Sequence, residues 1–143
     1  WAHQLQLTIA DFVAEAHNVH HPVSAELYYE EQRDEAQRAA ERFLAHRLPR
    51  FMGYFERVLQ AAGGTYALGW QLSYVDLSLF QLVTGLRYAF PNTMARLESA
   101  WPALIALHDR IAMRPNIAAY LRSPRRIPFN QEGIFRHYPE LDR

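Results

Sequence analysis

The stretch "LSYVDLSLF", Leu72–Phe80, contains the start of the helix on which the fold depends. Ser73 and Asp76 stand three residues apart directly before an apolar run, which is the spacing of a capping box. In such a box the Ser73 hydroxyl accepts from the N–H of residue 76, and the Asp76 carboxylate accepts from the N–H of residue 73. Leu72 and Leu77 flank the pair at the spacing of a hydrophobic staple. These signals predict a helix that begins at Ser73 and give Ser73 and Asp76 a structural role.

The helix that follows, predicted for residues 74–90, is apolar on nearly every face. Its large apolar side chains are Leu77, Leu79, Phe80, Leu82, Val83, Leu86, Tyr88 and Phe90. A helix that is apolar all round must be covered by other elements. We therefore expect it at the centre of a helical bundle, ending before Pro91.

Two longer helical patterns precede this central helix. Residues 1–20 carry apolar side chains at helical spacing and a polar stripe on another face, which predicts an amphipathic helix. Residues 28–62 show the same spacing, and we expect Pro49 to kink or split that helix because proline lacks an N–H donor. Gly63 and Gly64 are expected to end it.

Shorter helices are predicted after the central one, at residues 93–100, 102–114 and 115–121. Pro102 and Pro115 suit the first turn of the last two, where the missing N–H costs nothing. No segment shows a clear strand pattern. The predicted fold class is therefore all-α.

Composition narrows the range of functions. The chain has 143 residues, half of them apolar, which is typical of one globular domain. It contains no cysteine, and all 15 of its cationic side chains are arginine, so it offers neither a thiolate nor a Schiff-base lysine. The formal net charge is zero, and no apolar run reaches the length of about 18 residues that a membrane span needs. We expect neither a nucleic-acid partner nor a membrane partner.

The ends of the chain give two further expectations. The sequence begins at Trp1, without a methionine and in what reads as the middle of a helix, so we expect a segment of a larger protein. No export leader precedes the fold, which favours a cytoplasmic location. Near the other end, Arg122, Arg125 and Arg126 form a small basic cluster, for which a solvated surface is favoured over a phosphate site.

Three motifs resemble the C-terminal helical domain of cytosolic glutathione transferases, nearest in pattern to the sigma and pi groups. They are "TIADF" (8–12), "SYVDLSLF" (73–80) and "PALIALHDRIAMRPNIAAYL" (102–121). A capping box alone is generic, but its order and spacing relative to the Arg114–Pro115 turn are specific. The resemblance covers residues 1–126, and residues 127–143 look like an extension packed on or near the bundle.

The resemblance implies a function that belongs to a larger protein. Members of this family carry an N-terminal thioredoxin-like domain that binds most of glutathione and supplies the activating Tyr, Ser or Cys. This segment lacks that residue. The full-length protein would conjugate the thiolate of glutathione, its co-substrate, to small hydrophobic electrophiles, as a homodimer. The residues here would form one wall of the electrophile pocket and much of the dimer interface.

The resemblance also suggests site residues. It implies that Asp11 points across the dimer toward the γ-glutamyl amine of glutathione bound by the neighbouring subunit, where a carboxylate would be the charge partner. It implies that Val13, Ala16 and His17 line the electrophile site. No catalytic residue is expected in this segment.

A histidine cluster leaves another interpretation open. His17, His20 and His21 lie at i, i+3 and i+4, so a metal could be gripped by two of them. Histidines near a helix C-terminus are also favoured by the helix dipole without any metal, and from the sequence we expect no metal site. Two alternatives to the transferase therefore remain: a non-catalytic protein-interaction module of the same fold, and a metal-binding helical bundle.

Overall fold

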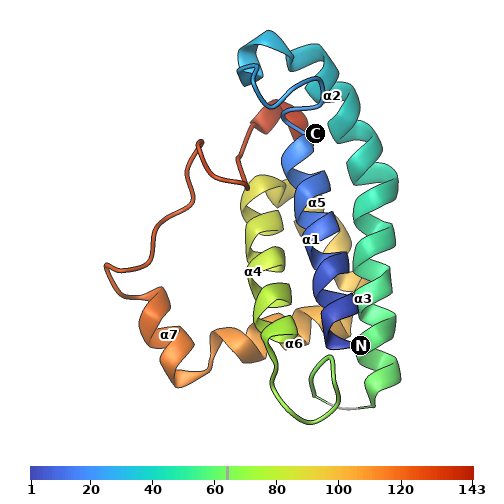
Figure 1. The fold of residues 1–143 in the computed structure, drawn as a ribbon, viewed down its shortest axis with the longest axis vertical. Helices are drawn as coiled ribbons and strands as arrows, with labels where there is room; N and C mark the ends of the chain where they lie inside the picture. Colours follow the sequence, from blue (N-terminus) through green and yellow to red (C-terminus); the bar gives the residue numbers. More distant parts are fainter. Residues whose placement is uncertain (64) are drawn as a thin grey trace.

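The computed structural model describes residues 1–63 and 65–143, which form helices and connecting loops without a strand (Figure 1). The α-helices are α1 (Ala2–Asn18), α2 (Arg33–Arg42), α3 (Leu48–Ala62), α4 (Tyr74–Ala89), α5 (Pro91–Leu97), α6 (Pro102–Ala112) and α7 (Pro115–Leu121). Short 3-10 turns lie at Tyr29–Glu31, Glu98–Ala100 and Pro139–Leu141. The predicted all-α fold class is confirmed.

The start of α4 forms as its sequence predicts, with an addition. Both halves of the capping box between Ser73 and Asp76 are present. Asp76 Oδ2 accepts from the Ser73 N–H at 2.8 Å and from the Ser73 hydroxyl at 2.9 Å. Asp76 Oδ1 accepts from the Ala67 N–H at 2.7 Å, so the same carboxylate also holds the preceding loop. Asp76 is fully buried, which makes these bonds structural.

α4 is the central helix, in contact with α1, α5 and α6 (Figure 1). Its buried residues span most of its circumference: Val75, Asp76, Leu79, Phe80, Leu82, Val83, Gly85, Leu86 and Ala89. α1 packs beside it through a stripe at helical spacing that includes Leu5, Ile9 and Phe12. Phe12 in turn stacks on Phe51 of α3, with ring centroids 4.5 Å apart. The all-apolar pattern of α4 thus corresponds to burial on several sides.

The second predicted helical region is divided, as Pro49 suggested. α2 ends at Arg42, a wider π-helical turn covers Phe43–Arg47, and α3 begins at Leu48. The Leu48 N–H bonds the Phe43 carbonyl, five residues back. This wider turn makes room for the Pro49 ring, which would otherwise crowd the carbonyl four residues earlier.

The ends of this region differ slightly from the prediction. Its first residues do not join the α-helix, since α2 begins only at Arg33 after the 3-10 turn. Gln32 explains the late start, because its buried side chain accepts from the Val23 N–H and donates to the Leu27 carbonyl, tying down the loop before it. α3 ends at Gly63 in a left-handed conformation (φ 60°). The second predicted stop residue, Gly64, lies outside the described residues.

The N-terminus of α6 is capped from another helix. Pro102 occupies the first turn, as predicted. The buried carboxylate of Glu56, on α3, accepts from the backbone N–H groups of Ala103 (3.1 Å) and Leu104 (2.9 Å). These donors have no partner inside the helix, so Glu56 joins α3 to α6 by a charge-assisted cap.

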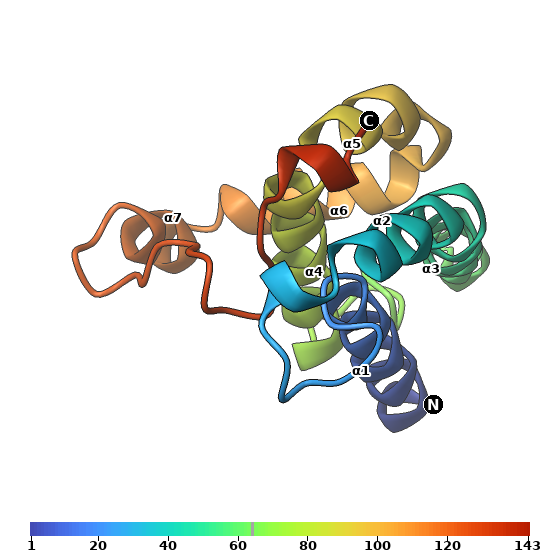
Figure 2. The same ribbon diagram turned by 90° about the horizontal axis from the view of Figure 1, so that it is seen from above.

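The C-terminal segment leaves the bundle with α7 and returns to it (Figure 2). The ring of Phe135 lies directly on Gly85 of α4, where a Cβ atom would come within 2.4 Å of it. Further on, the fully buried Asp142 accepts from the N–H groups of Asn92 (2.6 Å) and Thr93 (3.0 Å) at the start of α5. These contacts are among those that tie the end of the chain to the bundle.

Across the described residues, no helix combines the length and the hydropathy that crossing a bilayer would require.

Candidate functional site

A groove of about 740 Å³ lies between α1, α4 and the C-terminal segment. α1 contributes Gln6, Ile9, Ala10 and Val13, and α4 contributes Tyr74, Leu77, Ser78, Gln81 and Leu82. The C-terminal segment contributes Ile127, Pro128, Phe129, Asn130, Gly133, Ile134 and Phe135. This volume is in the range of small-molecule pockets.

Helical spacing explains why these side chains meet. On α1 the lining residues Gln6, Ile9 and Val13 follow one another at intervals of three and four, which places them on one stripe of the helix. The same intervals separate Tyr74, Leu77 and Gln81 on α4. Because α1 and α4 pack side by side, the two stripes form the two walls of one groove.

The C-terminal segment covers the groove. Phe135 is anchored on Gly85, and Phe129 stacks on Tyr88 of α4 with ring centroids 4.7 Å apart. Close to these anchors in sequence, Ile127 is 80% exposed and Ile134 is 51% exposed, although both line the groove. Apolar side chains exposed around a concavity indicate a surface suited to an apolar ligand.

The groove holds few polar atoms and, among the described residues that line it, no charged side chain. Gln6 Oε1 is buried and has no hydrogen-bond partner within the described part of the chain. The other polar side chains on the helical walls are the hydroxyl groups of Tyr74 and Ser78 and the amide of Gln81. This arrangement suits a largely apolar molecule that carries polar substituents.

The structure separates the residues that the sequence grouped as a site. Val13 lines the groove. Ala16 lies in the core and is 3% exposed, so its side chain does not reach the groove. His17 lines a different cavity, together with His21. Asp11 is exposed on an adjacent face of α1, next to the groove residue Ala10.

Most of the groove was not identified from the sequence. The residues from α4 were read only as core, although Ser78 and Gln81 interrupt its apolar pattern at an interval of three and were an available signal. The C-terminal residues carried no periodic signal, because an irregular segment reaches the groove only through tertiary contacts. Its aromatic side chains, Phe129 and Phe135, were the one local hint.

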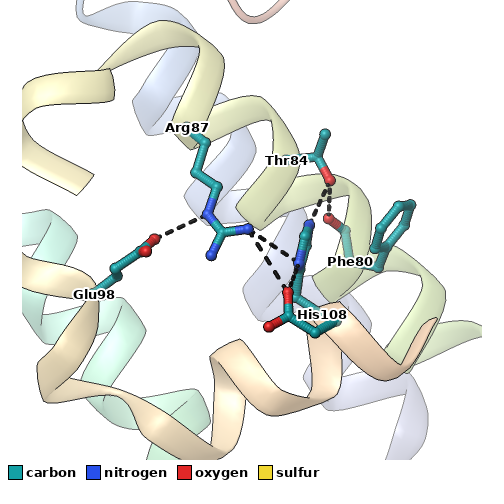
Figure 3. A network of polar contacts seen from close by, with 6 residues as sticks. Phe80, Thr84, Arg87, Glu98 and His108 are labelled. Carbon is teal, nitrogen blue, oxygen red and sulfur yellow. Dashed lines mark hydrogen bonds and ion pairs between the residues drawn. The ribbon is translucent and has the colours of Figure 1, made fainter. Parts of the chain in front are cut away.

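A second polar feature joins α4 to α6 outside the groove (Figure 3). The Thr84 hydroxyl donates to the Phe80 carbonyl at 2.7 Å, so its oxygen is free to accept from His108 Nε2 at 3.1 Å. His108 Nδ1 then lies between an Arg87 donor at 3.2 Å and the carboxylate of Asp109 at 2.9 Å. Neutral His108 accepts from Arg87, whereas a protonated ring would donate to Asp109.

The protonation of His108 is set by its surroundings. Burial lowers the pKa of His108 and nearby Arg87 lowers it further, while Asp109 and Glu98 oppose the shift. Arg87 is itself held by Glu98, at 2.9 Å. The network links three elements through a neutral imidazole, and we infer that its role is to stabilise the packing of these elements.

Two histidines of the cluster at the end of α1, His20 and His21, also have lowered pKa values. Burial lowers the pKa of His20 to about 4, with smaller contributions in the same direction from His17 and Arg136. The hydrogen bond to the Ile134 carbonyl acts the other way. Burial likewise lowers the pKa of His21.

Comparison with known proteins assigns a family. Residues 17–124 match the family described as glutathione S-transferase, C-terminal domain. The chain is 34% identical over 79 residues to a glutathione S-transferase of Plasmodium yoelii yoelii, an overlap that covers 55% of this chain and 36% of that protein. It is 34% identical over 87 residues to glutathione S-transferase A3 of Homo sapiens, covering 59% of this chain and 37% of that protein. It is 31% identical over 81 residues to glutathione S-transferase P 1 of Xenopus laevis, with coverages of 55% and 36%.

These overlaps span little more than a third of each relative, so they concern one part of those proteins. The family match covers well over half of this chain and includes two of the three motifs that carried the resemblance. With its helical bundle built around the capped central helix α4, the chain belongs to the family of glutathione S-transferase C-terminal domains.

Proposed function

We propose that this chain is the helical domain of a glutathione transferase and that the groove between α1 and α4 is one wall of its electrophile pocket. The observation that carries the proposal is the groove itself, an uncharged apolar concavity of about 740 Å³ in a member of this family. Val13 would contribute to its wall from α1, and Tyr74, Leu77 and Ser78 would contribute from α4.

The reaction is nucleophilic attack by the glutathione thiolate on an electrophilic carbon, in which a sulfur–carbon bond forms and a leaving group departs or a double bond takes up the electron pair. Lowering the thiol pKa would belong to a residue of an N-terminal domain. The groove would hold the electrophile in a fixed orientation against the thiolate, which is worth several kcal/mol when the reacting atoms are aligned. Apolar walls would also keep water from the reacting atoms.

Asp11 is proposed to bind the γ-glutamyl amine of glutathione in the neighbouring subunit of a homodimer. Two acids share this side of α1, and they differ in availability. Glu15 is engaged by Arg47 through two hydrogen bonds of 2.6 and 2.7 Å. Asp11 is exposed and makes no ion pair among the described residues, so its charge is available to an external ammonium group.

We also propose that the full-length protein is a homodimer with a cytoplasmic location. Several large apolar side chains are exposed outside the groove, including Trp1 (65%) and Trp70 (75%). Exposed aromatic side chains of this size are typical of interfaces with another domain or subunit. We propose that they are covered in the full-length homodimer.

The experiment is a glutathione-affinity column loaded with the full-length protein, followed by an assay of conjugation to a small aromatic electrophile. Retention and turnover are expected. A protein that is not retained and has no activity would instead be the non-catalytic interaction module.

The groove is tested by Ser78→Phe, which should raise KM for the electrophile and leave KM for glutathione unchanged. Ser99→Phe, on an exposed turn away from the groove, is the matched control and should change neither constant.

A further inference from the structure

The histidine cluster at the end of α1 is gathered by the backbone. After α1 ends at Asn18, the chain continues in two further turns, with the His20 N–H bonded to the His17 carbonyl and the His21 N–H bonded to the Asn18 carbonyl. The three imidazole rings are in mutual contact, with centroids 4.9 to 5.3 Å apart. One ring nitrogen of each lies within 4.8 Å of those of the other two.

One ring nitrogen of His20 has an unpaired lone pair. Its Nε2 lies 3.1 Å from the carbonyl oxygen of Ile134, and a carbonyl only accepts, so Nε2 carries the proton. Nδ1 is therefore an unprotonated acceptor. That atom is buried and has no hydrogen-bond partner among the described residues, on a side chain that is 2% exposed. A buried acceptor without a partner costs about 1 to 3 kcal/mol, which calls for a ligand at this position.

The other two rings are only partly buried, and they differ in their partners. His17 Nδ1 lies 3.3 Å from the side-chain oxygen of Asn18, which leaves Nε2 unprotonated. His21 Nε2 accepts from the Arg136 guanidinium at 3.0 Å, so its lone pair is paired with Arg136 in this structure. Its other nitrogen faces the amide nitrogen of Gln32, whose two hydrogens already point to the Ser24 and Leu27 carbonyls. His21 can therefore offer the lone pair of Nε2 to another ligand only after Arg136 has moved away.

We propose that His17, His20 and His21 form a binding site for a first-row transition-metal dication such as Zn²⁺. A ring that donates from one nitrogen to a backbone carbonyl and offers the other as a lone pair is the usual arrangement of a metal-bound histidine, and His20 has it. Three imidazole nitrogens suit zinc, copper or nickel rather than magnesium or calcium. At a zinc–nitrogen distance of about 2.0 to 2.1 Å, ligand atoms lie about 3.3 Å apart, so the rings need to close by at most about 1.5 Å.

The cavity beside the histidine cluster contains acidic side chains that favour a bound dication and one cation, Arg136, that opposes it. The cavity beside His17 and His21 is lined by Glu26, Glu30 and Glu132, any of which can offset the positive charge of the metal. Arg136 acts against binding, because its guanidinium must leave His21 before a dication arrives. An anion is a poorer fit, since the buried nitrogen of His20 is an acceptor and an anion needs donors.

The sequence alone favoured the helix dipole as the explanation for these histidines. That explanation accounts for a histidine in the last turn of a helix, but it requires no buried nitrogen without a partner. The position of the proton on His20 follows only from the contact with Ile134, which lies 114 residues away in the sequence.

The test is a calorimetric titration in which Zn²⁺ is added to the full-length protein in the absence of glutathione. The protein is purified without a histidine tag and is freed of metal with a chelator beforehand. One zinc per chain is expected, together with a higher melting temperature. His17→Ala, at a half-buried position that should fold, is expected to weaken zinc binding at least 10-fold. His46→Ala, which removes an exposed histidine of the same chain, is the matched control and should leave it unchanged.

Arg136→Gln gives a result in the opposite direction, because removing the competing cation should tighten zinc binding several-fold. The proposal is overturned if wild type and His17→Ala bind zinc equally, or if Arg136→Gln weakens zinc binding. Circular dichroism of each variant separates lost binding from lost folding. Since no step uses glutathione, zinc binding and conjugation can fail independently of each other.

Discussion

The carboxylate of Asp76 should stabilise the fold far more than its capping partner Ser73 does. Asp76 accepts from the buried Ala67 N–H, the Ser73 N–H and the Ser73 hydroxyl. Ser73→Ala removes only the hydroxyl and leaves both backbone bonds, so it should cost about 1 kcal/mol. Asp76→Ala leaves two backbone N–H groups without an acceptor at the base of the central helix, and should cost about 3 to 4 kcal/mol.

An intermediate variant sharpens this expectation. Asp76→Asn keeps the shape but turns one acceptor oxygen into an NH₂ donor, so one backbone N–H loses its partner at a cost of about 2 kcal/mol. The expected order of destabilisation is therefore Ser73→Ala, then Asp76→Asn, then Asp76→Ala.

The assay is urea unfolding of the full-length variants, followed by helical circular dichroism, with the exposed Ser99→Ala as the control. Specific activity per folded molecule should stay close to that of the wild type, because the pair does not line the groove. Equal unfolding midpoints for Ser73→Ala and Asp76→Ala would refute the reasoning, since the loop contact through Ala67 would then contribute nothing.

Three further predictions concern the groove cover, the α4–α6 network and glutathione. Gly85→Ala should destabilise the protein and expose the C-terminal segment to proteolysis, because the new Cβ would meet the Phe135 ring at 2.4 Å. In a Phe135→Ala background the same change should be neutral or stabilising, because alanine normally stabilises a helix by about 1 kcal/mol relative to glycine. The fold lowers the pKa of His108, so the unfolded chain binds more protons in acid and stability should fall as pH drops below about 6.5. His108→Gln should reduce the slope of that part of a pH series of urea melts, and the lowered pKa values of His20 and His21 should account for the slope that remains. Asp11→Asn should weaken glutathione binding about 10- to 100-fold in calorimetry, and the effect should vanish for an analogue without the γ-glutamyl amine; the exposed Asp34→Asn is the control, and equal loss for both ligands would indicate damaged packing instead.

The sequence by itself determined the family and most of the helices, although not all of their boundaries. The start of α4, the break at Pro49 and the first turn at Pro102 all depend on residues within four or five positions of one another. Periodicity and capping act over the same short range, so they can be recognised without knowing what the helices touch. The fully apolar pattern around α4 was likewise enough to place it at the centre of the bundle.

Only the tertiary structure decided which side chains share a site. Asp142 holds the start of α5 from a distance of 50 residues, Glu56 caps α6 from 48 residues away, and Ile134 sets the proton on His20 across 114 residues. None of these pairs has a local pattern, because hydrogen bonds between distant segments depend on how the helices pack and not on spacing along the chain. For the same reason α1 was recognised as a helix, yet which of its residues face the groove, the core or the histidine cluster became visible only in the folded chain.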